Sequence, residues 1–166
     1  AWMTLAIIYQ DKMNEGHKAV GPLKKYLAER GDDGNGWSRL ALSQFEAGDD
    51  AGALSSAEKA IQKGTSNPGA SLVRAKIAFK NGKFEDAGVA AMESAEKVPQ
   101  GNTAQAFEAR KLAGRAFAKA GRPQPAREQL NMAKSVNPND VEVLETLGDL
   151  AKAAGASELP KSTEMA

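Results

Sequence analysis

Apolar and small side chains recur every three or four residues over most of the chain, and charged residues and amides fill the intervals. In the stretch "WSRLALSQFEAGD", residues 37–49, Trp37, Leu40 and Ala41 share one side of a helix at about 100° per residue. Val, Ile and Thr are sparse, and no sustained run alternates between apolar and polar residues as a strand would. The pattern predicts an all-α protein with short polar turns.

The same pattern returns with a fixed period. Four glycines mark it, with spacings of 34, 39 and 34 residues: Gly48, Gly82, Gly121 and Gly155. The frame at Trp37 also occurs 35 residues earlier, at Trp2, and these are the only two Trp residues. The longer interval predicts a single insertion of five residues near residues 100–104. We conclude that one unit is written several times.

A helix-turn-helix unit of about 34 residues with these residue types resembles the tetratricopeptide repeat (TPR). The copies are carried by Trp2, Leu5, Ala6 and Tyr9; by Trp37, Leu40, Ala41, Gly48, Ala53, Ala57 and Ala60; by Ala75, Ala78, Gly82, Phe84, Ala87, Ala91 and Pro99; by Gly114, Phe117, Gly121, Ala126, Leu130, Ala133 and Pro138; and by Leu144, Leu147, Gly148, Ala151 and Gly155. Two departures stand out. The first copy is stretched between Tyr9 and Gly16, and Gln44 occupies a position where Tyr is usual.

The resemblance implies a right-handed α–α superhelix of about four and a half repeats. We expect repeat 1 at residues 1–34 with a stretched turn, repeat 2 at 35–67, repeat 3 at 68–102 and repeat 4 at 103–140. Residues 141–155 would form the first helix of a fifth unit or a capping helix. Residues 156–166 would be a weakly ordered tail, since Pro160 stands where a second helix would begin.

Each recurring residue has an expected structural role. The four period-marking glycines should end first helices in a left-handed conformation. Helices of one unit should approach closely at small residues: Ala41, Ala75, Gly114 and Gly148. Asp49, Asn67 and Asn139 are expected helix-start caps. Trp2 and Trp37 should be packing residues, and a fully buried Trp37 would lose about 3–5 kcal/mol on replacement by Ala.

Charge and composition exclude several functions. The 166 residues carry 22 Lys and Arg against 21 Asp and Glu, so nothing suggests a nucleic acid or an anionic membrane as the main partner. Cys is absent, which excludes disulfides and thiolate metal sites but does not decide between cytoplasm and periplasm. No apolar run is long enough to cross a bilayer, and no signal peptide is evident. The chain opens without an initiator Met, which suggests a mature region or an excised piece.

No catalytic or metal-binding constellation emerges from the sequence. The sole histidine, His17, lies in a polar turn without a Cys or second His to act with it. The stretch "GDDGNG", residues 31–36, resembles a calcium loop, but the closing Glu is missing, because the twelfth residue is Ser43 or Gln44. We therefore expect a protein that is not an enzyme and that uses no cofactor.

Helix geometry places another set of positions about 120° from the packing side of each first helix. In the family that the chain resembles, these positions line a concave groove that holds peptides. The groove residues we predict are Leu42, Phe45, Leu72, Lys76, Phe79, Lys111, Arg115, Glu145 and Asp149; the same positions also include Asn35, Ser38, Gly69, Glu108, Ala118, Glu142 and Lys152. Along the chain the groove changes from apolar through basic to acidic.

The leading hypothesis is a scaffold that binds an extended or helical segment of another protein, with acidic residues beside a bulky apolar anchor. Charge reversal at Lys111 and Arg115 should then weaken binding. One alternative is a structural module of a larger assembly, such as a bacterial envelope or secretion complex, that self-associates through its exposed ends. An RNA-binding helical repeat is a further alternative, against which the balanced charge and the acidic last unit argue.

Overall fold

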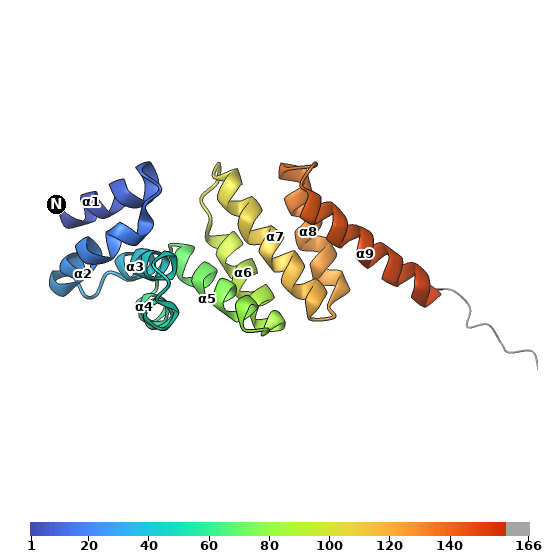
Figure 1. Cartoon of the computed structure of the whole chain (residues 1–166), viewed down its shortest axis with the longest axis horizontal. Helices are drawn as coiled ribbons and strands as arrows, with labels where there is room; N and C mark the ends of the chain where they lie inside the picture. The colour runs from blue at the N-terminus through green and yellow to red at the C-terminus, as the bar shows by residue number, and fades with distance from the viewer. Residues whose placement is uncertain (159–166) are drawn as a thin grey trace, which may run out of the picture.

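The computed structural model describes residues 1–158, and these form helix pairs stacked side by side along one axis (Figure 1). The helices are α1 (Trp2–Ile7), α2 (Val20–Glu29), α3 (Gly34–Glu46), α4 (Asp50–Gln62), α5 (Gly69–Lys80), α6 (Phe84–Lys97), α7 (Thr103–Lys119), α8 (Pro123–Val136) and α9 (Val141–Glu158). No strand occurs within residues 1–158, so the predicted all-α fold class is confirmed.

The first unit is the irregular one. After α1, the extra residues of the stretched turn form a π-helical turn, Ile8–Lys12, and a 3-10 turn, Gly16–Ala19. Gln10 in the π turn donates from Nε2 to the Arg39 carbonyl oxygen at 2.9 Å and to Ser43 Oγ at 2.8 Å. These bonds hold the stretched turn against α3.

Three of the four period-marking glycines end first helices as expected. Gly48, Gly82 and Gly121 have φ values of 82°, 76° and 73°, a conformation that costs Gly little because it has no Cβ. Gly155 was wrongly assigned this role, because it lies inside α9. The helix runs to Glu158 and therefore includes residues 156–158 of the expected tail; residues 159–166 lie outside the described part.

Side chains cap the helices at several starts. Asp49 accepts from the Gly52 backbone N–H at 2.9 Å, as expected. Asn67 accepts from the Gly69 N–H at 2.8 Å but is not the N-cap of α5, because it lies one residue before Pro68, which occupies that position. Asn139 is not the cap of α9; the neighbouring Asp140 is, through the Val143 N–H at 3.0 Å.

Alanine dominates the core, which lets helices pack closely. Ala41 and Ala75 are fully buried. At Gly114 in α7, an added Cβ would lie 2.4 Å from Leu130 Cγ in α8, so only Gly permits this approach. At Gly148 in α9 no atom lies within 4 Å of that position, and the expected close packing there is wrong for the described residues.

The five-residue insertion lengthens a helix instead of a loop. The connection before α7 covers residues 98–102, and that before α5 covers 63–68. In contrast, α7 has 17 residues and α5 has 12. The first turn of α7 extends beyond α5, on the side of the array where α1 lies (Figure 1). This extension shapes the groove described below.

The two Trp residues pack less deeply than a fully buried side chain. Trp37 is half-buried between two core clusters and donates from Nε1 to the Gly31 carbonyl oxygen at 2.9 Å. Trp2 at the end of the array is 40% exposed. The cost of about 3–5 kcal/mol for a fully buried ring therefore does not apply to either residue.

Candidate functional site

A row of three adjoining hollows follows the first helices of the units. The central hollow has a volume of about 890 Å³. Its lining comes from the first turn and from α3, α5, α7 and α9: Gln10, Asn14, Glu46, Leu72, Lys76, Asn102, Ala104, Gln105, Glu108, Lys111, Leu112, Arg115 and Glu142. It shares Gln10, Glu46, Asn102 and Gln105 with a hollow of about 400 Å³ that reaches Leu42. The third hollow shares Arg115 and Glu142 with the central one and reaches Glu145 and Asp149. We call these three hollows together the groove.

The extended start of α7 supplies one wall of the groove. Asn102 and Gln105 line the central hollow together with Gln10 and Asn14 of the first unit. Asn102 Oδ1 caps α7 by accepting from Gln105 N–H at 3.2 Å, and Asn102 Nδ2 donates to Gln105 Oε1 at 2.9 Å. Side-chain amides both donate and accept, so this wall suits the backbone of a bound chain. These four residues were not predicted from the sequence, although the insertion near residues 100–104 was a signal for Asn102 and Gln105, and the stretched turn between Tyr9 and Gly16 was one for Gln10 and Asn14.

The apolar part of the groove has cations above aromatic rings. Leu42 and Leu72 are half-buried and line the hollows. Lys76 Nζ lies 5.5 Å from the centre of the Phe45 ring, and the Arg115 guanidinium lies 5.2 Å from that of Phe79. The two Phe rings therefore lie beneath the cations, which themselves face the groove.

Lys111 and Arg115 are already paired within the chain. Lys111 Nζ lies 3.0 Å from Asp140 Oδ2 and 2.9 Å from Glu142 Oε2, and Arg115 lies 3.6 Å from Glu142. Only 16% of the Lys111 and Asp140 side chains is exposed. Of the basic residues expected in the groove, Lys111 and Arg115 are thus neutralised by two carboxylates at the start of α9.

Proton affinities reflect this network. The Lys111 hydrogen bond, together with the charges of Arg115 and Lys111, lowers the pKa of Glu142. The Val143 N–H, followed by Lys111, lowers the pKa of Asp140. Burial alone would lower the pKa of Lys111, but its bonds to Glu142 and Asp140 outweigh burial and raise it. All three groups are therefore held in their charged forms.

The acidic end of the groove is exposed. Glu145 and Asp149 line the third hollow, of about 570 Å³, together with Arg115 and Lys119. Neither carboxylate has an ion-pair partner among residues 1–158. This end can therefore accept a cation from a ligand.

Three positions predicted for the groove instead hold adjacent units together. Asn35 Oδ1 accepts from Thr65 Oγ1 at 2.8 Å, and from Ser66 and Asn67 N–H. Ser38 is fully buried, and its Oγ accepts from Ala70 N–H at 2.7 Å. Gly69 is buried against Leu42. The helical angle was right for these residues, but residues 65–70 cover the start of α3, and Leu42 of α3 covers Gly69 at the start of α5.

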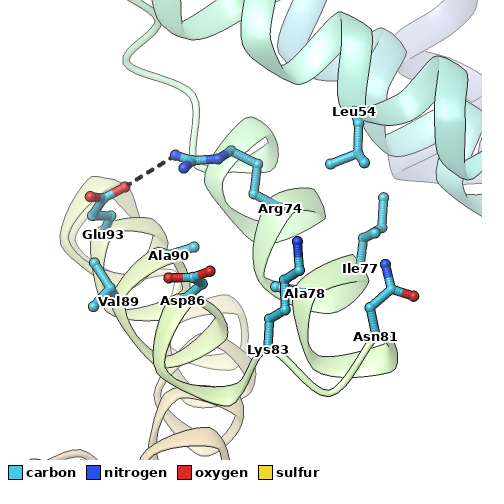
Figure 2. A pocket seen from close by; sticks show the side chains of 10 residues that line it. All are labelled: Leu54, Arg74, Ile77, Ala78, Asn81, Lys83, Asp86, Val89, Ala90 and Glu93. Atoms are coloured by element: carbon cyan, nitrogen blue, oxygen red, sulfur yellow. Dashed lines mark ion pairs between the residues drawn. The ribbon is translucent and has the colours of Figure 1, made fainter.

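A second kind of hollow lies on the other side of the first helices. Figure 2 shows one such hollow, with a volume of about 370 Å³. It is lined by Leu54 of α4, Ile77 and Ala78 of α5, and Val89 of α6, among others. Arg74 and Glu93 form an ion pair of 3.9 Å at its rim. Another of about 370 Å³ lies one unit earlier, between α2 and α4. We call these two the outer hollows.

Within the described residues, no three His, Cys, Asp or Glu side chains are grouped as a metal site would require. No helix among them is long and apolar enough to span a bilayer.

Comparison with solved structures identifies the fold. YrrB, described as a TPR protein with an unusual peptide-binding site, matches with a TM-score of 0.73 over 95% of this chain and 78% of that chain, at 16% sequence identity. MamA matches with a TM-score of 0.69 over 88% of this chain and 83% of that chain, at 17% identity. No protein-family profile and no curated protein matches the sequence. The likeness to YrrB confirms the predicted tetratricopeptide-repeat superhelix.

Proposed function

We propose that this tetratricopeptide-repeat solenoid is a non-enzymatic scaffold that binds an extended or helical segment of another protein in the groove. The central hollow is the observation that supports this, because every unit from the first turn to α9 contributes to its lining. A segment lying in it would contact all units at once. The peptide-binding site described for YrrB, which has the same fold, supports a peptide as the ligand class.

The internal ion pairs refine the chemistry of that segment. Lys76 has no carboxylate partner within residues 1–158, so an acidic residue of the ligand fits there, beside an apolar anchor on Leu42 and Leu72. Lys111 and Arg115 are occupied. The unpaired carboxylates of Glu145 and Asp149 favour basic residues further along. We therefore propose a mixed-charge segment in place of a purely acidic one.

Short peptides selected from a random displayed library on the immobilised protein test this proposal. Replacing Leu72 by Arg should weaken their binding more than about tenfold, because the anchor loses its apolar contact. Lys76→Glu should weaken it by a factor of about 2–10, since exposed charges are each worth little. Fluorescence anisotropy measures both effects.

Lys134→Glu on α8 is the matched control, because Lys134 is exposed, is absent from the groove lining and has no ion-pair partner among the described residues. It should bind the selected peptides as the parent does. This comparison replaces the double reversal of Lys111 and Arg115, which would break the bonds to α9 as well as change the groove. If Leu72→Arg and Lys76→Glu bind like the control while circular dichroism shows them folded, the groove is not the binding site.

Self-association is the second candidate function, and the C-terminal end of the array favours it. The exposed fractions are 64% for Val141, 41% for Leu144 and 48% for Met132. Leu130 covers Gly114, whereas Gly148, 34 residues later, is open among the described residues. The side of α9 that holds Val141, Leu144 and Gly148 therefore has room for another helix to pack on it, as α8 packs on α7. Sedimentation equilibrium should show a dimer that Leu144→Glu abolishes; a parent chain that stays monomeric at every concentration would refute this function.

A further inference from the structure

The outer hollow between α2 and α4 has lining chemistry of its own. Its floor is α3, where it touches Trp37, Leu40 and Gln44. At about 100° per residue, these three lie on the opposite side of α3 from Leu42 and Glu46, which line the groove. A ligand here would leave the groove free.

The repeat frame explains why this hollow is open. Gln44, Ala78 and Phe117 occupy equivalent positions, with spacings of 34 and 39 residues. Phe117 is 3% exposed, and its ring packs where a Cβ on Gly88 would otherwise sit. Gln44 and Ala78 each line an outer hollow instead, the latter in Figure 2. An aromatic ring at this position fills the space between helices, and a smaller or polar side chain leaves it open.

Gln44 brings an unused donor to this hollow. The side chain is only 6% exposed, and its Oε1 accepts from Ser56 Oγ at 2.6 Å. Its Nε2 donates to no atom within residues 1–158. It points toward the edge of the hollow, because it lies 2.9 Å from the position that a Cβ on Gly52 would take, and Gly52 is a lining residue. Among the described residues, the buried side-chain atoms without a hydrogen-bond partner are Glu15 Oε2 and Ser71 Oγ, so Gln44 Nε2 is open to solvent at the hollow. An acceptor on a ligand would take the place of water there.

The rest of the lining specifies the acceptor. Lys24 and Lys59 are exposed and lack ion-pair partners among the described residues, and none of the lining residues is acidic. Lys59 Nζ lies 4.5 Å from the centre of the Trp37 ring, so cation and aromatic surface adjoin. Asp49, whose Oδ1 caps α4, lies beside Gly52 and keeps its negative charge, so the two lysines outnumber one neighbouring carboxylate. Donor and cations together select an anion, and Leu27 and Leu40 provide apolar surface beside it.

We propose that this outer hollow is a second binding site, which takes a carboxylate attached to an aromatic or bulky apolar group. The carboxylate accepts from Gln44 Nε2 and is neutralised by Lys24 and Lys59. The apolar group lies against Leu27, Leu40 and Trp37. A volume of about 370 Å³ suits a single residue or a small aromatic acid. Two sources share this chemistry: the C-terminal residue of a protein and a free aromatic acid.

Nuclear magnetic resonance titration of the full chain tests the site with three ligands: N-acetyl-Gly-Phe, the same dipeptide as its C-terminal amide, and 3-phenylpropionate. The two acids should shift the Gln44 side-chain amide and Trp37 indole signals in a saturable way, and the amide should not. Tighter binding of the dipeptide acid would identify a protein C-terminus as the source, and tighter binding of 3-phenylpropionate a free acid. Equal shifts by acid and amide would overturn the proposal.

Variants separate this site from its neighbour. Gln44→Tyr fills the hollow and should abolish the shifts of Trp37, and Lys59→Met should weaken binding by a factor of about 2–5. Ala78→Tyr fills the other outer hollow and is the matched control, which should bind both acids as the parent does. If Gln44→Tyr still binds N-acetyl-Gly-Phe like the parent, or if neither acid shifts the Gln44 amide, the site is refuted. Either result leaves the groove untouched, because peptide binding there is measured through Leu72 and Lys76.

Discussion

Replacing Leu130 by Ala is expected to lower the free energy of unfolding by about 2–5 kcal/mol. Leu130 in α8 is fully buried, and its Cγ lies 2.4 Å from the position that a Cβ on Gly114 of α7 would take. The substitution removes apolar surface from the centre of the largest core cluster and leaves a cavity, because helices held by many Ala contacts collapse only partly. Equilibrium unfolding in urea measures the loss.

Gly114→Ala provides the complementary change. Its new Cβ would overlap Leu130, so we expect a loss of about 1–3 kcal/mol despite the better helix propensity of Ala. In the double variant, the methyl group added at position 114 occupies part of the space that the Leu130 side chain leaves. The double variant should therefore lose less stability than the sum of the two single losses, as expected for residues in contact.

Gly148→Ala is the control for this cycle, because it makes the same change at the equivalent place in α9, where no described residue lies within 4 Å. It should stabilise the protein by up to about 1 kcal/mol through helix propensity alone. If Gly114→Ala is as stabilising as Gly148→Ala, or if the two losses in the cycle are additive, α7 and α8 are not packed as described.

Replacing Lys111 by Met is expected to lower the free energy of unfolding by about 1.5–3 kcal/mol. The substitution keeps most of the side-chain volume but leaves Asp140 and Glu142 without their cation. Breaking a fully buried pair costs more. Here solvent reaches 16% of the Lys111 and Asp140 side chains and 52% of Glu142, which screens the lost attraction.

The pH dependence of stability identifies the cause. The fold lowers the pKa values of Asp140 and Glu142 from 3.8 and 4.5, so their contribution is present above those values and lost as pH falls through the folded ones. Between about pH 5 and pH 3, the parent should therefore lose more stability than Lys111→Met. Part of the dependence should remain, because the Val143 N–H still favours ionised Asp140.

Lys119→Met is the matched control on the same helix, since Lys119 lies over the Phe84 ring and has no carboxylate partner among the described residues. It should keep the acid dependence of the parent. Urea unfolding at a series of pH values compares the three proteins. Identical slopes for the parent and Lys111→Met would show that the network does not join α7 to α9.

Part of the groove could be predicted from the sequence, because helix geometry fixes which residues share a side. Leu42, Leu72 and Lys76 were predicted in this way, and in the structure they line adjoining hollows; their role in binding stays a prediction. The same geometry failed at Ser38 and Gly69, since it cannot show that the turn at residues 63–68 packs on Ser38 or that Leu42 covers Gly69. Nor can it show that Lys111 meets Asp140, which is 29 residues away in the chain.

The sequence by itself determined the repeat, the all-α class and the first-helix ends at Gly48, Gly82 and Gly121, because these depend on local preferences and on a period of 34 residues. The tertiary structure alone decided which charged residues of the groove form ion pairs within the chain and which have no such partner among the described residues. It also decided that the insertion extends α7 across the groove and that Gln44 leaves a hollow where Phe117 fills one. These features depend on the separation between helices, which is set by side chains distant in the chain and is therefore absent from any local pattern.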